Sequence, residues 1–245
     1  MTTSSQDDAF YDDGWANLWS DLKRYSPMGR HTRRWILRLL KNIPHPKTIA
    51  DIGCGEGSLL SDISLRYQSS QLLGCDFSEV SVKQSKQRIP NGRFVVHDLR
   101  NPDNPFGEIV DVGINSEVIE HIDDDVSAVR NMASWCRHLI VTVPSGRLDD
   151  SARAMGHLRH YTEPSLRRIV EGAGLDVLLI RTWGFPFAYP FYARMRNRVG
   201  HEEVTGSYSP MKRLITHSLY GLFYLNDAFR GGNKLFLLAS NPKFF

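Results

Sequence analysis

Short runs of apolar residues alternate with longer stretches of helical periodicity along most of this chain. Apolar residues at three- and four-residue spacing predict helices at 33–41, 58–65, 78–89, 124–136 and 164–171. The short runs predict seven strands, at 48–52, 72–76, 93–98, 109–115, 138–143, 176–182 and 234–240. Strands and helices in alternation indicate an α/β fold with a doubly wound, mostly parallel sheet.

The sequence also predicts where some of these helices begin and which side chains of one helix face the core. Ser58 and Ser78 stand at helix starts, where a hydroxyl can accept a hydrogen bond from a free N–H group. Residues 147–161 show no regular pattern, and we expect them to be irregular. In the helix at 124–136, the positions predicted to face inward are Val126, Val129, Met132, Ala133 and Cys136.

Two segments lie outside this alternation. Aromatic residues at near-helical spacing predict a helix over 10–22, and residues 1–45 would form a helical N-terminal lid or a helix packed on the sheet edge. Residues 183–232 are too long for a connection between strands and predict a helical insertion. We expect residues 46–245 to form a ligand-binding domain that this insertion caps. A dimer contact or a membrane-surface element is the competing interpretation.

Composition adds a few constraints. The 245 residues are 41% hydrophobic and 23% charged, and no apolar run reaches the roughly eighteen residues of a membrane span. The N-terminus lacks a signal-peptide pattern and the three cysteines lack metal-binding spacing, which favours a reduced, cytoplasmic setting. The net charge of +3 is concentrated in residues 181–245, where nine Lys or Arg stand against three Asp or Glu. This basic end would favour an anionic substrate or an acidic surface, or it is an ordinary solvated face.

The strongest chemical signal is the turn after the first strand. Asp51 is followed there by alternating glycines at Gly53, Gly55 and Gly57. Glycines let the backbone turn sharply and let a ligand approach without a Cβ in the way. Asp76 ends the second strand, about twenty residues later, where an acid meets a ribose in nucleotide-binding α/β units. The third and fourth strands also end in polar residues, so the sequence predicts a nucleotide site at this edge of the sheet.

In this order, the motifs resemble those of the class I S-adenosylmethionine (SAM)-dependent methyltransferases, over roughly residues 45–182 and 234–240. Within that group the chain is similar to the ubiquinone-pathway O-methyltransferases and other small-molecule enzymes. A dehydrogenase would space its glycines G-x-G-x-x-G instead. The resemblance implies a Rossmann-like sheet with an antiparallel seventh strand, SAM as the cofactor and S-adenosylhomocysteine (SAH) as the product.

The resemblance assigns cofactor contacts to the first strand and its loop. Asp51 would lie near the methionine amine and balance its charge. The loop would pass close to the methionine and ribose of the cofactor through Gly53, Cys54, Gly55 and Gly57.

Later strand ends would hold the rest of the cofactor. Asp76 would accept two hydrogen bonds from the ribose hydroxyls, and Phe77 would stack on the adenine. Asp98 would accept from the adenine amine while Leu99 packs on the ring. At the end of the fourth strand, backbone contacts to the methionine would come from Asn115 and Ser116.

A cluster of metal-binding residue types follows the fourth strand. If Glu117, Glu120 and His121 open a helix, their spacing puts all three on one face. Two carboxylates and an imidazole can hold a divalent cation. The run resembles the metal-dependent small-RNA 3′-terminal 2′-O-methyltransferases, in which a Glu-x-x-Glu-His run and a later His hold the ion. His157 is the better match to that later His.

The same residues also permit a reaction without metal. His121 or His157 would then be a general base, or a polar wall of the pocket, and metal is the minor alternative. A bound cation would instead lower the pKa of a hydroxyl nucleophile. His160 and Tyr161 are lesser candidates, and we expect Tyr161 to pack under the helix that follows.

The predicted function is SAM-dependent methyl transfer to an O or N atom of a small-molecule acceptor. In-line displacement from a sulfonium needs positioning and exclusion of water more than catalytic groups. The aromatic run 183–192 suggests an apolar or aromatic acceptor, and Arg194 and Arg196 suggest that it has an anionic end.

The alternatives are metal-assisted RNA 3′-terminal methylation, a non-catalytic SAM-binding protein and a nicotinamide-dependent oxidoreductase. The charge of only +3 and the lack of an RNA-binding module argue against a nucleic-acid partner. We expect a monomer or a homodimer without a transmembrane segment.

Overall fold

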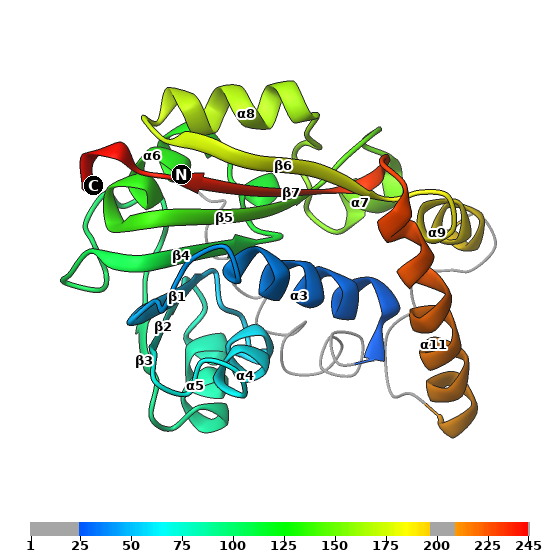
Figure 1. The fold of residues 1–245 in the computed structure, drawn as a ribbon, viewed down its shortest axis with the longest axis horizontal. Coiled ribbons are helices and arrows are strands. Elements are labelled where there is room, and N and C mark those ends of the chain that lie inside the picture. The colour runs from blue at the N-terminus through cyan, green and yellow to red at the C-terminus, as the bar shows by residue number, and fades with distance from the viewer. Residues whose placement is uncertain (1–24, 197–208, 245) are drawn as a thin grey trace.

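The computed structural model describes residues 25–196 and 209–244. Its strands form one seven-stranded sheet in the order β3-β2-β1-β4-β5-β7-β6 (Figure 1). Their bounds are β1 Thr48–Ile52, β2 Gln71–Asp76, β3 Arg93–Val96, β4 Val110–Ser116, β5 Cys136–Pro144, β6 Asp176–Gly184 and β7 Gly232–Ser240. β7 runs antiparallel to β5 and β6, and the other neighbouring pairs are parallel. The predicted doubly wound, mostly parallel sheet is confirmed, including its antiparallel seventh strand.

Helices cover both faces of this sheet. On one face α6 and α8 pack through side chains such as Trp135 and Leu166, and on the other α3, α4 and α5 pack through Trp35, Leu60 and Val82. Figure 1 shows α8 above β6 and α3 below β4 and β5. The α-helices are α3 Pro27–Leu40, α4 Ser58–Ser64, α5 Glu79–Arg88, α6 Asp125–Trp135, α7 Asp150–Ala154, α8 Glu163–Gly172, α9 Ala188–Arg196 and α11 Pro210–Phe223. The short 3₁₀ helices are η2 Ile119–His121, η3 Tyr224–Ala228 and η4 Pro242–Phe244.

Two helices differ from their predicted extent. α3 begins at Pro27 rather than at residue 33, because the Ser26 side chain caps it and proline suits the first helical turn. Residues 147–161, predicted to be irregular, contain the single-turn helix α7. Its N-cap is Asp149, whose carboxylate accepts a hydrogen bond from the Ala152 N–H at 2.9 Å.

The inward face of α6 is also shifted from its prediction. Val126 was predicted to face the core but is 43% exposed. The buried stripe passes instead through Ala128, Val129, Met132 and Ala133, which follow helical spacing from an N-cap at Asp124. Val126 therefore lies on the solvent side of the first turn.

β3 is shorter than the predicted strand at 93–98. Asp98 Oδ1 accepts a hydrogen bond from the Arg100 N–H at 2.9 Å, two residues along the chain. Aspartate favours such turns because its side chain replaces a backbone acceptor. The turn ends the strand at Val96 and leaves Asp98 in the loop that follows.

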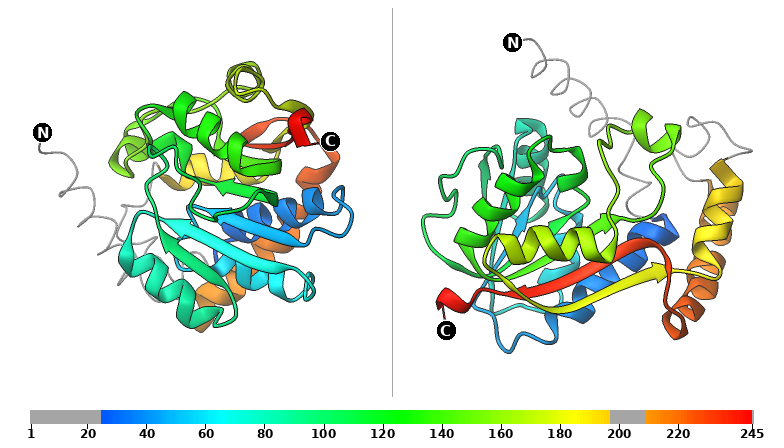
Figure 2. Two further views of the ribbon diagram at one scale, coloured as in Figure 1. Left: turned by 90° about the vertical axis from the view of Figure 1, so that its left-hand side faces the viewer. Right: turned by 90° about the horizontal axis from the view of Figure 1, so that it is seen from above.

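The helical insertion predicted at 183–232 lies between β6, which ends at Gly184, and β7, which begins at Gly232. The structure describes it at residues 185–196 and 209–231. α9 and α11 lie side by side beyond the ends of these strands (Figure 2), with the rings of Phe191 and Phe223 5.8 Å apart. α11 also packs along α3. Both terminal nitrogens of the Arg34 guanidinium on α3 donate to the Asp227 carboxylate of η3 at 2.7 Å. The insertion is thereby fixed to a helix that precedes the first strand.

Some expectations lie beyond what the fold tests. The helix predicted at 10–22 is outside the described residues, so the lid function of residues 1–45 and the boundary at 45 stay predictions.

Cys54, Cys75 and Cys136 are buried free thiols. Within 25–196 and 209–244, no helix combines the length and the apolar character needed to cross a membrane.

Candidate functional site

The loop between β1 and α4 requires glycine at two positions. Gly53 has φ of +87°, and a Cβ there would lie 2.4 Å from Cγ2 of Val118. Gly57 has φ of +80° and forms the N-cap of α4 without a side-chain hydrogen bond. The prediction that Ser58 caps this helix is therefore wrong, because Ser58 is already its first residue. Glycine adopts these positive φ values without strain. Because Gly53 has no Cβ, the loop can also pass close to Val118 in the turn after β4.

Asp76 fastens this loop to the next strand. Its Oδ2 accepts a hydrogen bond from the Gly55 N–H at 2.8 Å, and its Oδ1 accepts one from the Ser78 N–H at 3.0 Å. The side chain is buried at the end of β2. A carboxylate accepts hydrogen bonds at about four positions, which is the chemistry that a pair of ribose hydroxyls would need. The sequence pattern did not predict that Asp76 also stabilises the glycine loop, through its hydrogen bond with Gly55.

Asp51 and Asn115 lie on neighbouring strands at the same edge. Asp51 is buried and lies in register with Ile114 of β4. Asn115 is fully buried, and its Nδ2 donates to the Ile52 carbonyl at 2.8 Å. Among the described residues, Asn115 Oδ1 accepts no hydrogen bond. The Asn115 side chain thus offers a buried acceptor where the sequence predicted backbone contacts alone.

The three residues predicted to contact adenine differ in their exposure. Phe77 is 39% exposed next to Asp76, whereas Leu99 is buried in the core. Asp98 forms an ion pair with Arg100 at 2.6 Å. Burial opposes ionisation of Asp98, but the hydrogen bonds from Arg100 outweigh it and hold the pKa of the carboxyl below its usual value. An adenine amine would have to share Asp98 with Arg100.

The chain after β4 does not form the predicted helix face. Glu117 has φ of +60°, η2 spans one turn at Ile119–His121, and α6 begins at Asp125. A left-handed residue breaks the helical path, so the i, i+3, i+4 relation between Glu117, Glu120 and His121 does not apply. The condition under which these three side chains would share a helix face is therefore not met.

Glu117 turns instead toward β7. Its carboxylate forms an ion pair with the Lys234 ammonium and accepts a hydrogen bond from the Thr142 hydroxyl at 3.2 Å. The Ser116 hydroxyl, predicted at the methionine end, lies 2.9 Å from that of Thr142. Sequence reasoning missed Lys234. The sequence shows Lys234 only as a lone basic residue at the start of an apolar strand, which could have marked it as the partner of a buried acid.

Glu120 and His121 of η2 come together with His157, which lies in the segment after α7. One potential ligand atom from each lies within 4.8 Å of the others. His121 Nδ1 lies 3.1 Å from the Gly156 carbonyl oxygen. His157 Nδ1 forms a hydrogen bond with His160 Nε2 at 3.0 Å. The predicted pairing of His121 with the later His157 is thus present in space, with His160 as a further member.

The protonation of this cluster bears on its chemistry. Burial lowers the pKa of His157 to about 3, and repulsion from His121 and His160 adds to the effect. Burial also lowers the pKa of His160. His157 is therefore neutral at pH 7, able to bind a cation but weak as a general base. Tyr161 is buried, as expected, and its hydroxyl donates to Asp125 Oδ2 at 2.7 Å.

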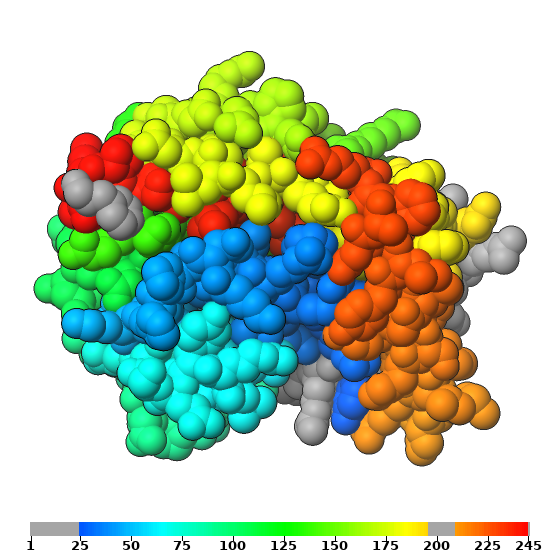
Figure 3. All heavy atoms as spheres, viewed as in Figure 1, coloured from blue at the N-terminus to red at the C-terminus, as the bar shows by residue number. Residues whose placement is uncertain are grey.

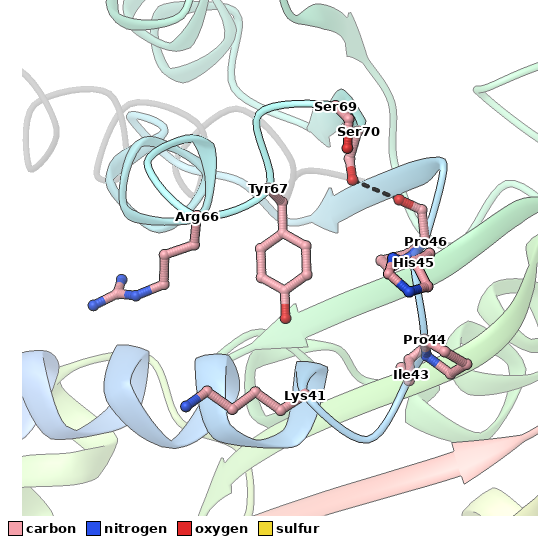
Figure 4. A pocket seen from close by; sticks show the side chains of 9 residues that line it. All are labelled: Lys41, Ile43, Pro44, His45, Pro46, Arg66, Tyr67, Ser69 and Ser70. Carbon is pink, nitrogen blue, oxygen red and sulfur yellow. Dashed lines mark hydrogen bonds between the residues drawn. The ribbon is translucent and has the colours of Figure 1, made fainter.

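A hollow of about 460 Å³ lies at the opposite, amino-terminal edge of β1 and β2 (Figure 4). Lys41, Arg66 and Tyr67 line it, together with the segment 43–46 and a serine pair whose Ser70 hydroxyl donates to the Pro46 carbonyl. No residue predicted for cofactor or catalysis is among its lining residues. In doubly wound sheets ligands bind at the carboxyl ends of strands, so this hollow is not the predicted site.

Comparison with known families decides among the nucleotide-binding α/β folds. A family model described as "Methyltransferase domain" matches residues 22–180. The match spans well over half of the chain and includes the glycine loop, Asp76 and the histidine cluster.

The chain belongs to the methyltransferase-domain family.

Individual proteins are also similar to this methyltransferase domain. It is 24% identical over 160 residues to trans-aconitate 2-methyltransferase from Rhodopseudomonas palustris (strain BisB18), an alignment that covers 63% of this chain and 61% of that protein. The chain thus spans less than two thirds of that curated relative.

Solved structures extend the likeness to nearly the whole chain. N-methyltransferase NodS from Bradyrhizobium japonicum WM9, in complex with SAH, is 15% identical with a TM-score of 0.64, covering 96% of this chain and 98% of that one. The [4+2]-cyclase SpnF is 17% identical with a TM-score of 0.64, covering 98% and 97%. At these identities the likeness shows the fold alone.

The methyltransferase family and the Rossmann-like fold predicted from the motifs are therefore confirmed. The narrower resemblances, to ubiquinone-pathway and small-RNA enzymes, stay predictions. A structural neighbour described as a cyclase shows that this fold does not by itself fix the reaction.

Proposed function

We propose that this protein is a SAM-dependent methyltransferase that acts on an O or N atom of a small-molecule acceptor. The supporting observation is the contact between Gly55 and Asp76 at the carboxyl edge of a methyltransferase-domain sheet. It places an acidic side chain against a glycine loop, the combination that binds a nucleoside in such folds. The SAH bound to the structurally similar NodS is consistent with this cofactor.

The chain's own residues divide the cofactor between them. Asp76 holds the ribose hydroxyls through its carboxylate, and Phe77 covers the adenine. Asp51 and the side-chain oxygen of Asn115 receive the methionine ammonium, because both are buried acceptors at adjacent strand ends. When bound, SAM supplies an electrophilic methyl carbon that an acceptor atom attacks in line with the sulfur.

The histidines and the insertion serve the acceptor. His121 takes the proton from a hydroxyl or ammonium acceptor, since burial leaves His157 a weak base. α9 and α11 shield the reacting atoms from water. The exposed rings of Phe185, Phe187 and Tyr189, together with Arg194, favour an apolar or aromatic acceptor with an anionic end. Trp183 of the predicted aromatic run is buried in β6, where its indole N–H donates to Asp227 Oδ1 at 3.0 Å. The similar trans-aconitate 2-methyltransferases are named for an anionic acceptor.

A metal-assisted reaction, as in the small-RNA enzymes, is the second candidate. It is favoured by the proximity of Glu120, His121 and His157. These residues would hold the cation, which would make a ribose hydroxyl more acidic. However, Glu117 is bound to Lys234, so the four-residue set predicted from the sequence is incomplete. For this reason we favour the reaction without metal.

Calorimetric titration with SAM, SAH and NAD tests the cofactor first. SAM and SAH should bind with micromolar or better affinity and NAD should not. Binding of NAD alone would overturn the proposal.

A second experiment tests the acceptor. The protein is incubated with deuterium-labelled SAM and with either the small-molecule fraction or the RNA fraction of a cell extract. Label in the RNA fraction that disappears with a chelator would favour the metal-assisted candidate, and SAM binding without any labelled product would indicate a non-catalytic SAM-binding protein.

A further inference from the structure

Residues 156–161, which we call the clamp segment, hold the turn that carries His121. The Leu158 N–H of this segment donates to the Glu120 carbonyl at 2.8 Å. The Gly156 carbonyl oxygen lies 3.1 Å from Nδ1 of the His121 ring. η2, to which Glu120 and His121 belong, also packs on β5 and α6. The clamp segment therefore contacts both the backbone of η2 and the side chain that is proposed to act as the base.

Arg159 of the clamp segment reaches several backbone carbonyls of this turn. Its guanidinium donates to the Ile122 carbonyl and, at 2.8 Å, to the Asp123 carbonyl, and it lies 3.5 Å from the Ile119 carbonyl oxygen. Carbonyls at and just beyond the end of a helix lack partners within it, so donors from another segment hold this part of the chain. Arginine spreads five N–H donors over a rigid planar fork, whereas the three donors of lysine share one nitrogen. The Asp125 carboxylate, 3.6 Å away, balances the charge of Arg159.

The position of the clamp segment also determines which nitrogen of His121 carries hydrogen. A neutral imidazole has one N–H donor and one acceptor nitrogen, and a neighbouring hydrogen bond decides which is which. Because the Gly156 carbonyl can only accept, Nδ1 of His121 must carry the hydrogen in this contact. Nε2 is then the nitrogen with the lone pair, so it is the one that can take a proton from an acceptor.

The clamp segment and the insertion are held by different parts of the fold. The clamp segment connects α7 to α8, whereas α11 packs along α3 and forms a lobe of the molecular surface, orange in Figure 3. A change at Arg159 should therefore act on η2 while α11 keeps its contacts with α3.

We propose that Arg159 is a positioning residue, which holds η2 so that His121 keeps its hydrogen on Nδ1 and presents Nε2 to the acceptor. This inference rests on the proposed function, in which His121 takes the proton of the acceptor. Arg159 acts through the backbone carbonyls of η2 rather than on the acceptor itself. Misplacing a reacting group by about 1 Å can lower a rate a hundredfold, so a side chain that fixes this turn bears on the reaction.

NMR of the full-length protein labelled with ¹⁵N-histidine tests the orientation of the ring. At about pH 8.5, where an ordinary imidazole is neutral, His121 of the wild type should carry its hydrogen on Nδ1, and the variant His121→Gln identifies its signals. Arg159→Gln should give a mixture of both tautomers. Arg159→Lys keeps the charge but not the fork, so it should restore the wild-type tautomer only in part. A hydrogen on Nε2 in the wild type would overturn the proposal, and this result does not depend on whether an Arg159 variant folds.

The rate of methyl transfer gives a second measurement. With deuterium-labelled SAM and the small-molecule fraction of a cell extract, Arg159→Gln should form labelled product about tenfold or more slowly than the wild type. Its affinity for SAM, measured by calorimetry, should stay unchanged. Arg167→Gln is the matched control, because it removes an exposed ion pair with Glu171 on α8, and it should keep the wild-type tautomer and rate.

The outcomes separate a positioning role from a structural one. An Arg159→Gln protein that unfolds at a lower temperature but keeps the wild-type tautomer and rate would overturn the proposal. A loss of SAM affinity as large as the loss of rate would also overturn it. Either result would leave the proposed function standing, which fails only if the wild type binds no SAM or forms no labelled product.

Discussion

The two sides of the candidate site are built over different distances along the chain. On the cofactor side, formed by the loop after β1 and the ends of β2, β3 and β4, Gly55 binds Asp76 within one strand–helix–strand unit. On the proposed acceptor side, formed by residues 117–160 and the described parts of the insertion (185–196 and 209–231), Glu117 binds Lys234 and Arg34 of α3 binds Asp227. Contacts between residues that are close in the chain produce a sequence motif from which they can be predicted. Pairings between distant residues appear in the sequence only as isolated charged residues, and their partners can be identified only from the fold.

The largest expected effect tests the cofactor side. Asp76→Ala should raise the dissociation constant for SAM about a hundredfold, because the variant loses charge-assisted hydrogen bonds to the ribose and releases the Gly55 loop. Calorimetry measures it directly. Asp103→Ala, in an exposed loop, is the control and should bind SAM normally. Unchanged affinity in Asp76→Ala would remove the basis for assigning this side to the cofactor.

Gly53→Ala should follow in size. The positive φ and the contact with Val118 should lower the free energy of unfolding by about 1–3 kcal/mol. Urea denaturation measures this loss. Gly172→Ala, where an added Cβ meets nothing within 4 Å, should be neutral or slightly stabilising. If both substitutions had the same effect, the loop would not depend on its left-handed conformation.

The Arg34–Asp227 pair tests the acceptor side alone. Asp227→Asn should cost about 1–2 kcal/mol, less than a fully buried pair would, since both side chains keep some solvent access. It should leave SAM affinity unchanged, because the pair lies away from the glycine loop. A parallel loss of SAM binding would show that the two sides of the site are coupled.

The same pair predicts a pH dependence. Burial opposes ionisation of Asp227, but hydrogen bonds from Arg34 outweigh it and hold its pKa below the usual 3.8. The stability that the charged form adds is therefore complete above about pH 4 and is lost as the pH falls through the lowered pKa. The difference between wild type and Asp227→Asn should shrink accordingly. A difference that stays constant down to pH 2 would contradict the ion pair.

The smallest effect concerns His157. Its pKa in the folded protein, about 3, is lower than the 6.5 expected when unfolded. The unfolded chain therefore takes up the proton first, and stability should fall as the pH drops below 6.5. Between pH 7 and pH 5 the wild type should lose roughly 1 kcal/mol more than His157→Gln, after allowance for partial exposure. His217→Gln on α11 is the control, and an identical loss in both variants would contradict the burial of His157.

The predictability of each side follows the same division. Strand periodicity and glycine spacing predicted the sheet and the placement of Asp51 and Asp76, because these depend on neighbours in the chain. A shared helix face for Glu117, Glu120 and His121 does not form, because Glu117 has a left-handed backbone. The partners of its side chain, Thr142 and Lys234, come from other strands and leave no local pattern. His121 and His157 were paired from a family resemblance rather than from spacing. Even local predictions can be wrong by one residue. Ser58 is a favourable N-cap residue, but α4 is capped by Gly57 and Ser58 is its first residue.

The place of β7 between β5 and β6 bears on how the protein matures during translation. The cofactor side can assemble once β4 has left the ribosome, because its contacts lie within the segment already made. β6 stands at the sheet edge with β7 as its neighbour, and Glu117 takes its counter-charge from Lys234 on that strand. A nascent chain can therefore complete the contact between Gly55 and Asp76 well before Glu117 acquires its counter-charge from Lys234.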